Sequence, residues 1–134
     1  MDKKNSHPLT PQELFENTLW YFYLAVKELS KPAASQCEKV PDSISIAWEI
    51  KDDFLRDCGL HRLPHSYLSQ EQIVGIEHLA ETLESVPESV FESSRTNLQA
   101  MQHPCWSPIR KEAEQLLALL EPAHERNKIY FKVS

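Results

Sequence analysis

Glycine is nearly absent from this sequence, with only Gly59 and Gly75 among 134 residues. Nucleotide-binding loops need closely spaced glycines, as in G-x-x-x-x-G-K or G-x-G-x-x-G, because their backbone amides must come close to the phosphates. Gly59 and Gly75 stand too far apart to form either loop. This absence excludes the nucleotide-binding enzyme classes that depend on such loops.

Paired cysteines and long apolar runs are also missing. Cys37, Cys58 and Cys105 are odd in number and form no C-x-x-C pair, which is typical of reduced thiols in the cytosol. Residues 1–9 are mostly polar and predict a disordered lead-in rather than a secretory leader. The longest apolar run, residues 19–26, is far shorter than the about 20 residues that cross a bilayer. We expect a soluble cytoplasmic protein that forms a single domain, residues 1–134, and folds without disulfides.

Basic residues are fewer than acidic ones, with 14 Lys and Arg against 20 Asp and Glu in the sequence. The formal charge is -6 and the pI is near 5.5. Nonspecific binding of DNA or RNA needs a basic face that neutralises phosphates, and this balance argues against it. The charge favours a basic protein partner, or none.

Helix signals are what the sequence has in quantity, and its nine prolines stand mainly at predicted helix ends. Residues 10–13 (TPQE) and 69–72 (SQEQ) each combine an N-cap with a side chain that can reach back to it. Apolar residues then recur at helical spacing. The predicted helices cover about residues 11–30, 42–58, 69–86, 87–102 and 107–122, joined by loops over 31–41 and 60–68. The predicted fold class is all-α, a compact bundle of about five helices.

The bundle is expected to be organised around residues 42–58, whose apolar side chains fall on two sides of a helix. One stripe holds Ile46, Ala47, Ile50 and Phe54, and the opposite one holds Ile44, Trp48 and Leu55. We therefore expect burial on both sides, with Trp48 in the core and a narrow, mostly acidic edge in water. Asp42 or Ser43 is the expected N-cap, and Gly59 is expected to end the helix in the left-handed conformation. Residues 44–50 also alternate like a half-buried strand, so that alternative stays open.

The last segment has a different pattern. Residues 127–134 alternate apolar and polar side chains, which is the period of a strand, and the sequence offers no obvious second strand. Backbone groups in an extended segment need partners. We expect residues 123–134 to form an extended C-terminal arm that packs over the helices or against another chain, or that pairs with residues 44–50 if those form a strand.

Histidine and cysteine occur at two places with spacings that suggest metal ligands. The pairs C-x-x-H and H-x-C belong to a set of five residues: Cys58, His61, His65, His103 and Cys105. The spacing is not a zinc signature, and thiols at the ends of apolar helices are commonly buried, so we expect no metal and no cofactor. A nucleophilic Cys105 assisted by His103 or His124 has no recognisable orienting group or oxyanion site, and we assign no catalytic residue.

Charged and aromatic faces are the better candidates for a functional surface. Three glutamates of the helix over residues 69–86 fall within about 60° of one another, and three carboxylates share the polar edge of the central helix. Two aromatic residues of the first helix fall outside its core stripe, and exposed aromatics are favoured interface anchors. Solvated acidic faces, Mg²⁺-binding carboxylates and aromatics covered by another helix are the alternatives. The predicted partner-binding residues are Glu77, Glu81, Glu84, Glu49, Asp52, Asp53, Trp20 and Tyr23.

In its size, its acidity and the acidic faces at residues 77–84 and 49–53, the chain resembles the small immunity proteins of bacterial toxin systems, including contact-dependent growth inhibition. The resemblance implies a protein that binds a toxin domain in the cytoplasm, such as a basic nuclease, and masks its active site. Two other functions stay open. One is a small helical enzyme or metal-binding protein that uses the carboxylates or the His/Cys set, and the other is a regulatory homodimer joined through Trp20 and Tyr23.

Overall fold

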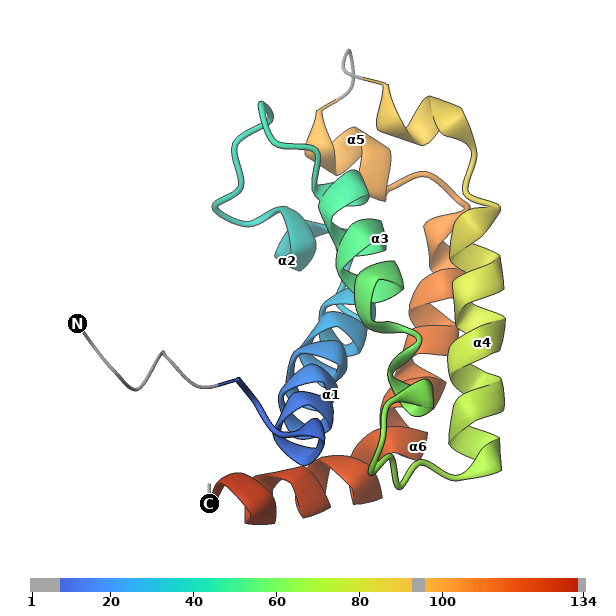
Figure 1. The fold of residues 1–134 in the computed structure, drawn as a ribbon. Helices are drawn as coiled ribbons and strands as arrows, with labels where there is room; N and C mark the ends of the chain where they lie inside the picture. Colours follow the sequence, from blue (N-terminus) through green and yellow to red (C-terminus); the bar gives the residue numbers. More distant parts are fainter. Residues whose placement is uncertain (1–7, 93–95, 133–134) are drawn as a thin grey trace, which may run out of the picture.

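Helices make up all of the regular structure in residues 8–92 and 96–132, the part of the chain that a computed structural model describes (Figure 1). Helix accounts for 73% of the structure and the described residues contain no strand, which confirms the all-α prediction. The elements in order are α1 (Pro11–Leu29), α2 (Ala33–Cys37), α3 (Ile46–Asp57), the 3₁₀ turn η2 (Leu60–Arg62), α4 (Gln70–Glu84), the 3₁₀ turn η3 (Glu88–Phe91), α5 (Asn97–Met101) and α6 (Trp106–Phe131). None of the described helices has the length and apolar character that a membrane span requires. Most of the predicted lead-in, residues 1–7, lies outside the described residues.

Three long helices, α1, α6 and α4, lie side by side, and α3 lies over α1 (Figure 1). α6 packs against both α1 and α4, while α3 lies over α1 and also contacts α4 (Figure 1). Their facing sides share one core. Its largest fully buried side chains are Trp106, Phe15, Phe22, Phe54, Leu19, Leu29, Leu60, Ile76, Leu79, Leu83, Met101 and Ile109. α3 therefore has one side against the bundle and the other toward solvent.

The starts of α1 and α4 confirm the predicted capping boxes. The Thr10 hydroxyl oxygen accepts the backbone N–H of Glu13 at 3.1 Å, and Glu13 Oε1 accepts the N–H of Thr10 at 2.8 Å. Ser69 and Gln72 make the same reciprocal pair at 3.2 and 2.7 Å. Each box satisfies two amides that have no partner within their helix. Local capping chemistry is enough to set these two boundaries.

α3 is a helix, so the strand alternative for residues 44–50 is wrong, but the helix begins later than predicted. Ser45 is the N-cap in place of Asp42 or Ser43. Asn97 supplies a second acceptor, because its Oδ1 takes the backbone N–H of Ile46 at 3.0 Å. The Asn97 backbone N–H in turn donates to Asp42 Oδ1 at 2.9 Å. Asp42 is thus used to hold α5, and this long-range contact decides where α3 starts.

Two other predicted features are wrong. Gly59 has φ -90°, so it does not adopt the left-handed conformation expected at the end of α3. The single helix expected over residues 87–102 is replaced, in the described residues, by η3 and α5. Glu92 is extended and ends η3, and Thr96 opens α5 with a capping box of its own to Gln99. A strong local cap therefore divides the segment.

α6 continues through Pro122 to Phe131, so the extended arm predicted for residues 123–134 is wrong as far as the described residues reach. Figure 1 shows the two halves of α6 running in different directions. A proline inside a helix removes one backbone hydrogen bond and crowds the preceding turn. We attribute the bend to Pro122, which redirects the helix and does not end it.

A buried polar network holds the last part of α6 against α1. Glu16 is 3% exposed, and its Oε1 accepts hydrogen bonds from the Tyr67 hydroxyl at 2.9 Å and from Asn127 Nδ2 at 3.0 Å. Asn127 is fully buried and also donates to the backbone oxygen of Glu16 at 2.9 Å. A buried carboxylate without donors is strongly destabilising, so these bonds are required once Glu16 is inside. They select helix over the strand that the alternating pattern suggested.

Asn127→Ala tests this network. We expect the free energy of unfolding to fall by about 2–3 kcal/mol, because the Glu16 carboxylate loses a donor while remaining buried. Urea denaturation measures the change. Ile129→Ala is the matched control on the same turns, since Ile129 is 76% exposed and its loss should cost under about 0.5 kcal/mol. Equal losses from the two substitutions would contradict the role assigned to Asn127.

A second polar contact joins α4 to α6. His78 Nδ1 is paired with the Glu112 carboxylate, which also accepts the Thr82 hydroxyl at 3.3 Å. The hydrogen bond to Glu112 and the charge of that carboxylate hold the pKa of His78 above its usual value. This contact depends on a histidine proton, so its contribution to stability depends on pH.

We predict that the His78–Glu112 pair stabilises the fold more in acid than in base. Because the pKa of His78 is raised in the folded state, the contribution is complete below the unfolded pKa of about 6.5 and disappears as pH rises through the folded value. The loss of unfolding free energy caused by His78→Gln should be larger at about pH 5.5 than at about pH 9. Glu112→Gln should lose the same pH-dependent part. Losses that do not change with pH would rule out this pair as a charged contact.

Candidate functional site

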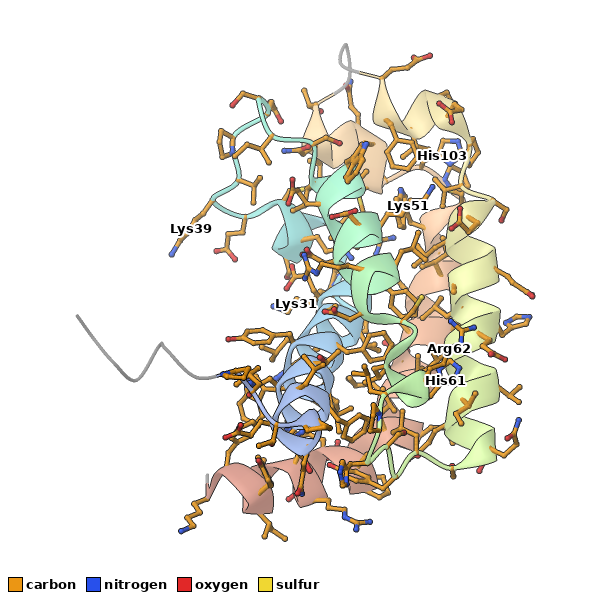
Figure 2. The ribbon with its side chains drawn as sticks, viewed as in Figure 1. Lys31, Lys39, Lys51, His61, Arg62 and His103 are labelled. Carbon is orange, nitrogen blue, oxygen red and sulfur yellow. The ribbon has the colours of Figure 1, made fainter. Side chains whose placement is uncertain are left out.

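The residues of the metal hypothesis lie in separate places. Figure 2 shows His61 and His103 well apart in the molecule. His103 Nδ1 accepts the backbone N–H of Cys105 at 3.0 Å, and Cys58 Sγ lies 3.3 Å from the backbone oxygen of Leu55. In the described part of the chain, no three His, Cys, Asp or Glu side chains converge closely enough to hold a metal ion. The structure therefore does not bring this set together.

Cys105 lies in a setting that disfavours nucleophilic chemistry. Burial raises the pKa of its thiol, and the nearby charge of Arg110 opposes that effect only in part. The thiolate is the reactive form, so a raised pKa lowers reactivity at neutral pH. His124, the other base considered, is stacked on Tyr23 with ring centroids 3.7 Å apart. No feature of this site adds to the catalytic hypothesis.

Trp20 and Tyr23 lie against the last part of α6, which limits them as interface anchors. Tyr23 is 8% exposed, donates to Glu121 Oε1 at 2.9 Å and stacks on His124. Burial, aided by Glu121, raises the pKa of Tyr23 to about 12. Trp20 is half-buried, with its ring centroid 5.5 Å from that of His124 and 5.7 Å from that of Phe131. The segment predicted to be an extended arm covers both residues as a helix.

The α4 glutamates point away from the bundle. The buried residues of α4 are Gln72, Ile76, Leu79 and Leu83. Glu77, Glu81 and Glu84 are exposed on the opposite side, and Glu77 Oε2 lies 3.5 Å from His61 Nε2. They form an outward-facing acidic stripe, called the α4 stripe below.

The outer side of α3 carries both acids and an aromatic residue. Glu49 and Asp52 are exposed, and Asp53 is half-buried with its Oδ1 3.2 Å from Arg56 Nη1. Trp48 stands among them and is 54% exposed, so its predicted burial is wrong. These four residues, Trp48, Glu49, Asp52 and Asp53, are called the α3 face below. The face joins three predicted site residues to Trp48, for which the helical periodicity predicts a place in the core.

Trp48 is exposed because the second apolar stripe of α3 is covered only in part. Ala47, Ile50 and Phe54 pack into the core. In the opposite stripe Leu55 is half-buried against the core, whereas Trp48 is 54% exposed. Ile44, which belonged to that stripe, lies before the helix and is 45% exposed. The signal was present in the sequence as two opposite stripes on one helix. Such a pattern indicates either two-sided burial or an uncovered apolar side, and only the packing distinguishes the two.

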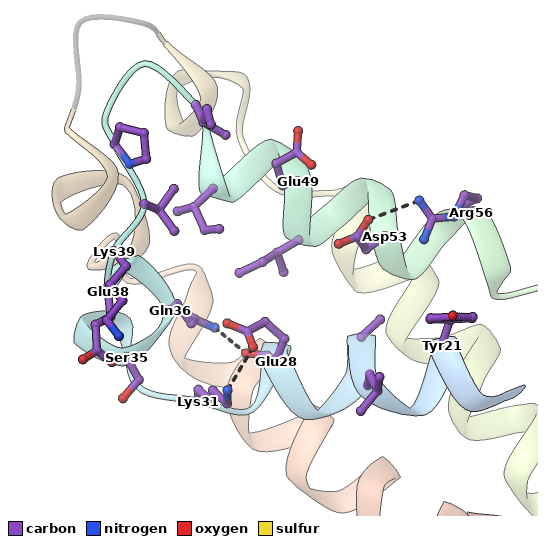
Figure 3. Close-up of a pocket in the computed structure, with 17 residues that line it drawn as sticks. Tyr21, Glu28, Lys31, Ser35, Gln36, Glu38, Lys39, Glu49, Asp53 and Arg56 are labelled. Carbon is purple, nitrogen blue, oxygen red and sulfur yellow. Dashed lines mark hydrogen bonds and ion pairs between the residues drawn. The ribbon is translucent and has the colours of Figure 1, made fainter. Parts of the chain in front are cut away.

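On one side of the α3 face a groove of about 740 Å³ runs between α1 and α3 (Figure 3). Glu49 and Asp53 line it from α3, and Figure 3 shows Tyr21 and Glu28 across from them on α1. Tyr21 is 62% exposed, and the neighbouring Leu24 of α1 is 44% exposed. The groove thus combines apolar side chains on both walls with charged groups of both signs, because Lys31, Lys39 and Arg56 line it together with the carboxylates.

α2 closes the end of this groove, within the segment predicted to be a loop. The buried Gln36 donates through Nε2 to the backbone oxygens of Glu28 and Leu29, the last two carbonyls of α1. Arg110 donates to Gln36 Oε1 at 2.9 Å and to the backbone oxygen of Lys31 at 2.9 Å. These bonds fix α2 to α1 and α6. The groove is therefore built from anchored elements.

On the other side of the α3 face lies a smaller hollow of about 220 Å³ between α3 and η3. Its residues are Trp48, Lys51, Asp52, Leu55, Glu88 and Phe91. We call it the Trp48–Phe91 pocket. Lys51 Nζ lies 5.1 Å from the centre of the Phe91 ring, which is cation–π range. Trp48 thus forms one wall of a pocket while much of its ring remains open to solvent.

The placement of α3 can be tested by comparing two of its aromatic residues. Phe54→Ala should lower the free energy of unfolding by about 3–5 kcal/mol, because Phe54 is fully buried in the core. Trp48→Ala should lower it by under about 1 kcal/mol, since the side chain is largely exposed. Urea denaturation measures both values. A larger loss from Trp48→Ala than from Phe54→Ala would show that α3 presents its other side to the core.

The α3 face, with a hollow on each side, is the candidate functional site. It combines acidic side chains and an exposed tryptophan with a groove and a pocket. The α4 glutamates have no tryptophan among them, and Trp20 and Tyr23 are partly or largely buried. Comparisons of the chain with protein-family models, with curated proteins and with solved structures find no match.

Proposed function

We propose that this chain is a protein-binding module, and that it acts as an immunity protein which neutralises a bacterial toxin domain by covering a basic surface or active site. One observation carries the proposal. Trp48 is 54% exposed in an acidic face, between a groove of about 740 Å³ and a pocket of about 220 Å³. Each part of this arrangement supports a different aspect of partner binding.

The exposed apolar side chains supply binding free energy. Tryptophan is among the residues most enriched at the energetic centres of protein interfaces, because it buries a large area with little loss of conformational entropy. The groove on the other side of the α3 face also exposes Tyr21, Leu24 and Ile44, each by more than two-fifths. Scattered exposed apolar residues are ordinary, but several beside a groove are typical of interaction sites. Trp48 is the expected energetic centre.

The carboxylates supply charge selectivity. Glu49 and Asp52 are exposed beside Trp48, and the whole chain carries a formal charge of -6. Such a surface attracts a basic partner, speeds its association and disfavours acidic competitors. A toxin that binds nucleic acid has a basic site for phosphate, and the α3 face offers carboxylates in place of that phosphate. The chemistry of the face fits such a target.

The α4 glutamates have a secondary role in this proposal. Glu77, Glu81 and Glu84 are exposed, and η2 links α4 to the end of α3 through the His61–Glu77 contact. Charges at the rim of an interface mainly change the association rate, whereas buried anchors mainly change the dissociation rate. We assign the α3 face to the centre of the contact and the α4 stripe to its rim.

Two charge reversals of equal size separate these roles. The partner is first captured from the native bacterium by affinity purification or tested as the product of a neighbouring gene. Glu49→Lys/Asp52→Lys and Glu81→Lys/Glu84→Lys each reverse two acids, so their net charges match. We expect the α3 reversal to slow association more and to weaken binding more, with both effects reduced at high salt. Surface plasmon resonance at low and high salt gives the rates.

Trp48→Ala completes this test. Loss of a central tryptophan should raise the dissociation rate by about tenfold or more, with little change in association rate. The variant should keep nearly wild-type stability, so lost binding cannot be attributed to unfolding. If the α4 reversal weakened binding more than the α3 reversal, the contact would centre on α4. If none of the three variants changed binding, both acidic faces would be ordinary solvated surfaces and the proposal would be wrong.

A further inference from the structure

We propose that the Trp48–Phe91 pocket binds an arginine side chain of the basic partner. The inference rests on the proposed function, because it names the chemical group by which that partner is recognised at the α3 face. It also stands on features of the pocket itself: the composition of its walls, a cation that the chain already places there, and its size.

The walls of the pocket combine the two surfaces that a guanidinium prefers. Trp48, Leu55 and Phe91 provide aromatic and apolar area, and Asp52 and Glu88 provide exposed carboxylates. A guanidinium can stack its planar face on an aromatic ring while its edge donates to carboxylates. The carboxylates come from both elements that form the pocket, α3 and η3. A cation is therefore favoured there over a neutral or acidic group.

The chain itself shows that this wall accepts a positive charge. Lys51 belongs to the pocket, and its ammonium nitrogen lies 5.1 Å from the centre of the Phe91 ring. This is a cation–π contact made by a flexible, half-buried side chain. Lys51 is consequently an internal competitor for an incoming cation. Its removal should make the pocket more available, so a variant without Lys51 should bind an added cation more tightly.

Size and hydration favour arginine as the occupant. The pocket volume of about 220 Å³ equals roughly seven water-sized volumes of ~30 Å³, which is the scale of one long side chain. A guanidinium is more weakly hydrated than an ammonium, stacks on aromatic faces and donates in a fixed fork. Trp48, the most exposed aromatic of the pocket, offers a stacking surface that a lysine ammonium uses less fully.

The test uses a small probe and needs no partner. N-acetyl-argininamide is titrated into the full chain while the indole N–H signal of Trp48 is followed by NMR, with Trp48→Phe used to assign that signal. We expect a saturable shift with a dissociation constant in the millimolar range, reduced by salt. N-acetyl-citrullinamide, which has the same shape without the charge, should give no saturable shift.

Two variants test whether the arginine probe binds in the Trp48–Phe91 pocket. Asp52→Asn/Glu88→Gln keeps the shapes of the side chains and should weaken the arginine probe by about fivefold or more. Lys51→Met removes the internal cation and should tighten binding, an effect that damage to the fold would not produce. Citrulline binding as tight as arginine, or unchanged arginine binding in Asp52→Asn/Glu88→Gln, would overturn the proposal.

The outcome can be separated from that of the proposed function. If the arginine probe fails to bind while Glu49→Lys/Asp52→Lys still weakens the captured partner, the protein-binding function stands and the pocket assignment is wrong. If the probe binds as expected, the pocket assignment is supported. Loss of partner affinity in Asp52→Asn/Glu88→Gln, measured by surface plasmon resonance, then shows that the pocket is used in the complex.

Discussion

The buried carboxylate of Glu16 is the constraint on which the rest of this structure depends. It lies between α1 and α6 and must receive hydrogen bonds there, because a buried charge without donors would cost more than most single contacts contribute. Tyr67 and Asn127 supply those bonds, and the guanidinium of Arg126 lies 4.2 Å from the Tyr67 ring. The network joins α1, the segment before α4 and the last turns of α6. It fixes where α6 must go after Pro122.

The course of α6 in turn decides which surfaces are left to a partner. Its last turns lie against Trp20 and Tyr23, so the aromatic side of α1 is largely closed. α1, α6 and α4 lie side by side, and α3 lies over α1 without another long helix on its outer side (Figure 1). In the second apolar stripe, Ile44 and Trp48 are consequently exposed, and Leu55 is only half-buried. The exposure of Trp48 thus follows from the way the other helices pack against one another.

The sequence predicts this fold as far as its determinants are local. Thr10 with Glu13 and Ser69 with Gln72 are within one turn of each other, and both helix starts are confirmed. The errors at the start of α3 and in the course of α6 involve contacts that no local pattern contains: Asn97 caps α3 from 51 residues away, and Asn127 meets Glu16 across 111 residues. The division of residues 87–102 is different, because the Thr96–Gln99 capping box is local. The candidate site divides in the same way. Periodicity placed the carboxylates of the α3 face on a helix edge, but the exposure of the aromatic beside them depends on which elements pack there.

The α3 face is a better centre for binding than the α4 stripe, because solvated charges and exposed apolar area have different effects on a complex. An exposed acidic stripe raises the rate of encounter, but solvated charges contribute little to the lifetime of the complex once salt screens them. A long lifetime needs apolar area that leaves water, and on α3 that area is Trp48, with the groove and the pocket to receive side chains around it. Carboxylates next to such an anchor are partly desolvated when it is buried, and their selectivity for a cation then increases. Acidic residues beside an exposed tryptophan can therefore determine both which partner binds and how long it stays.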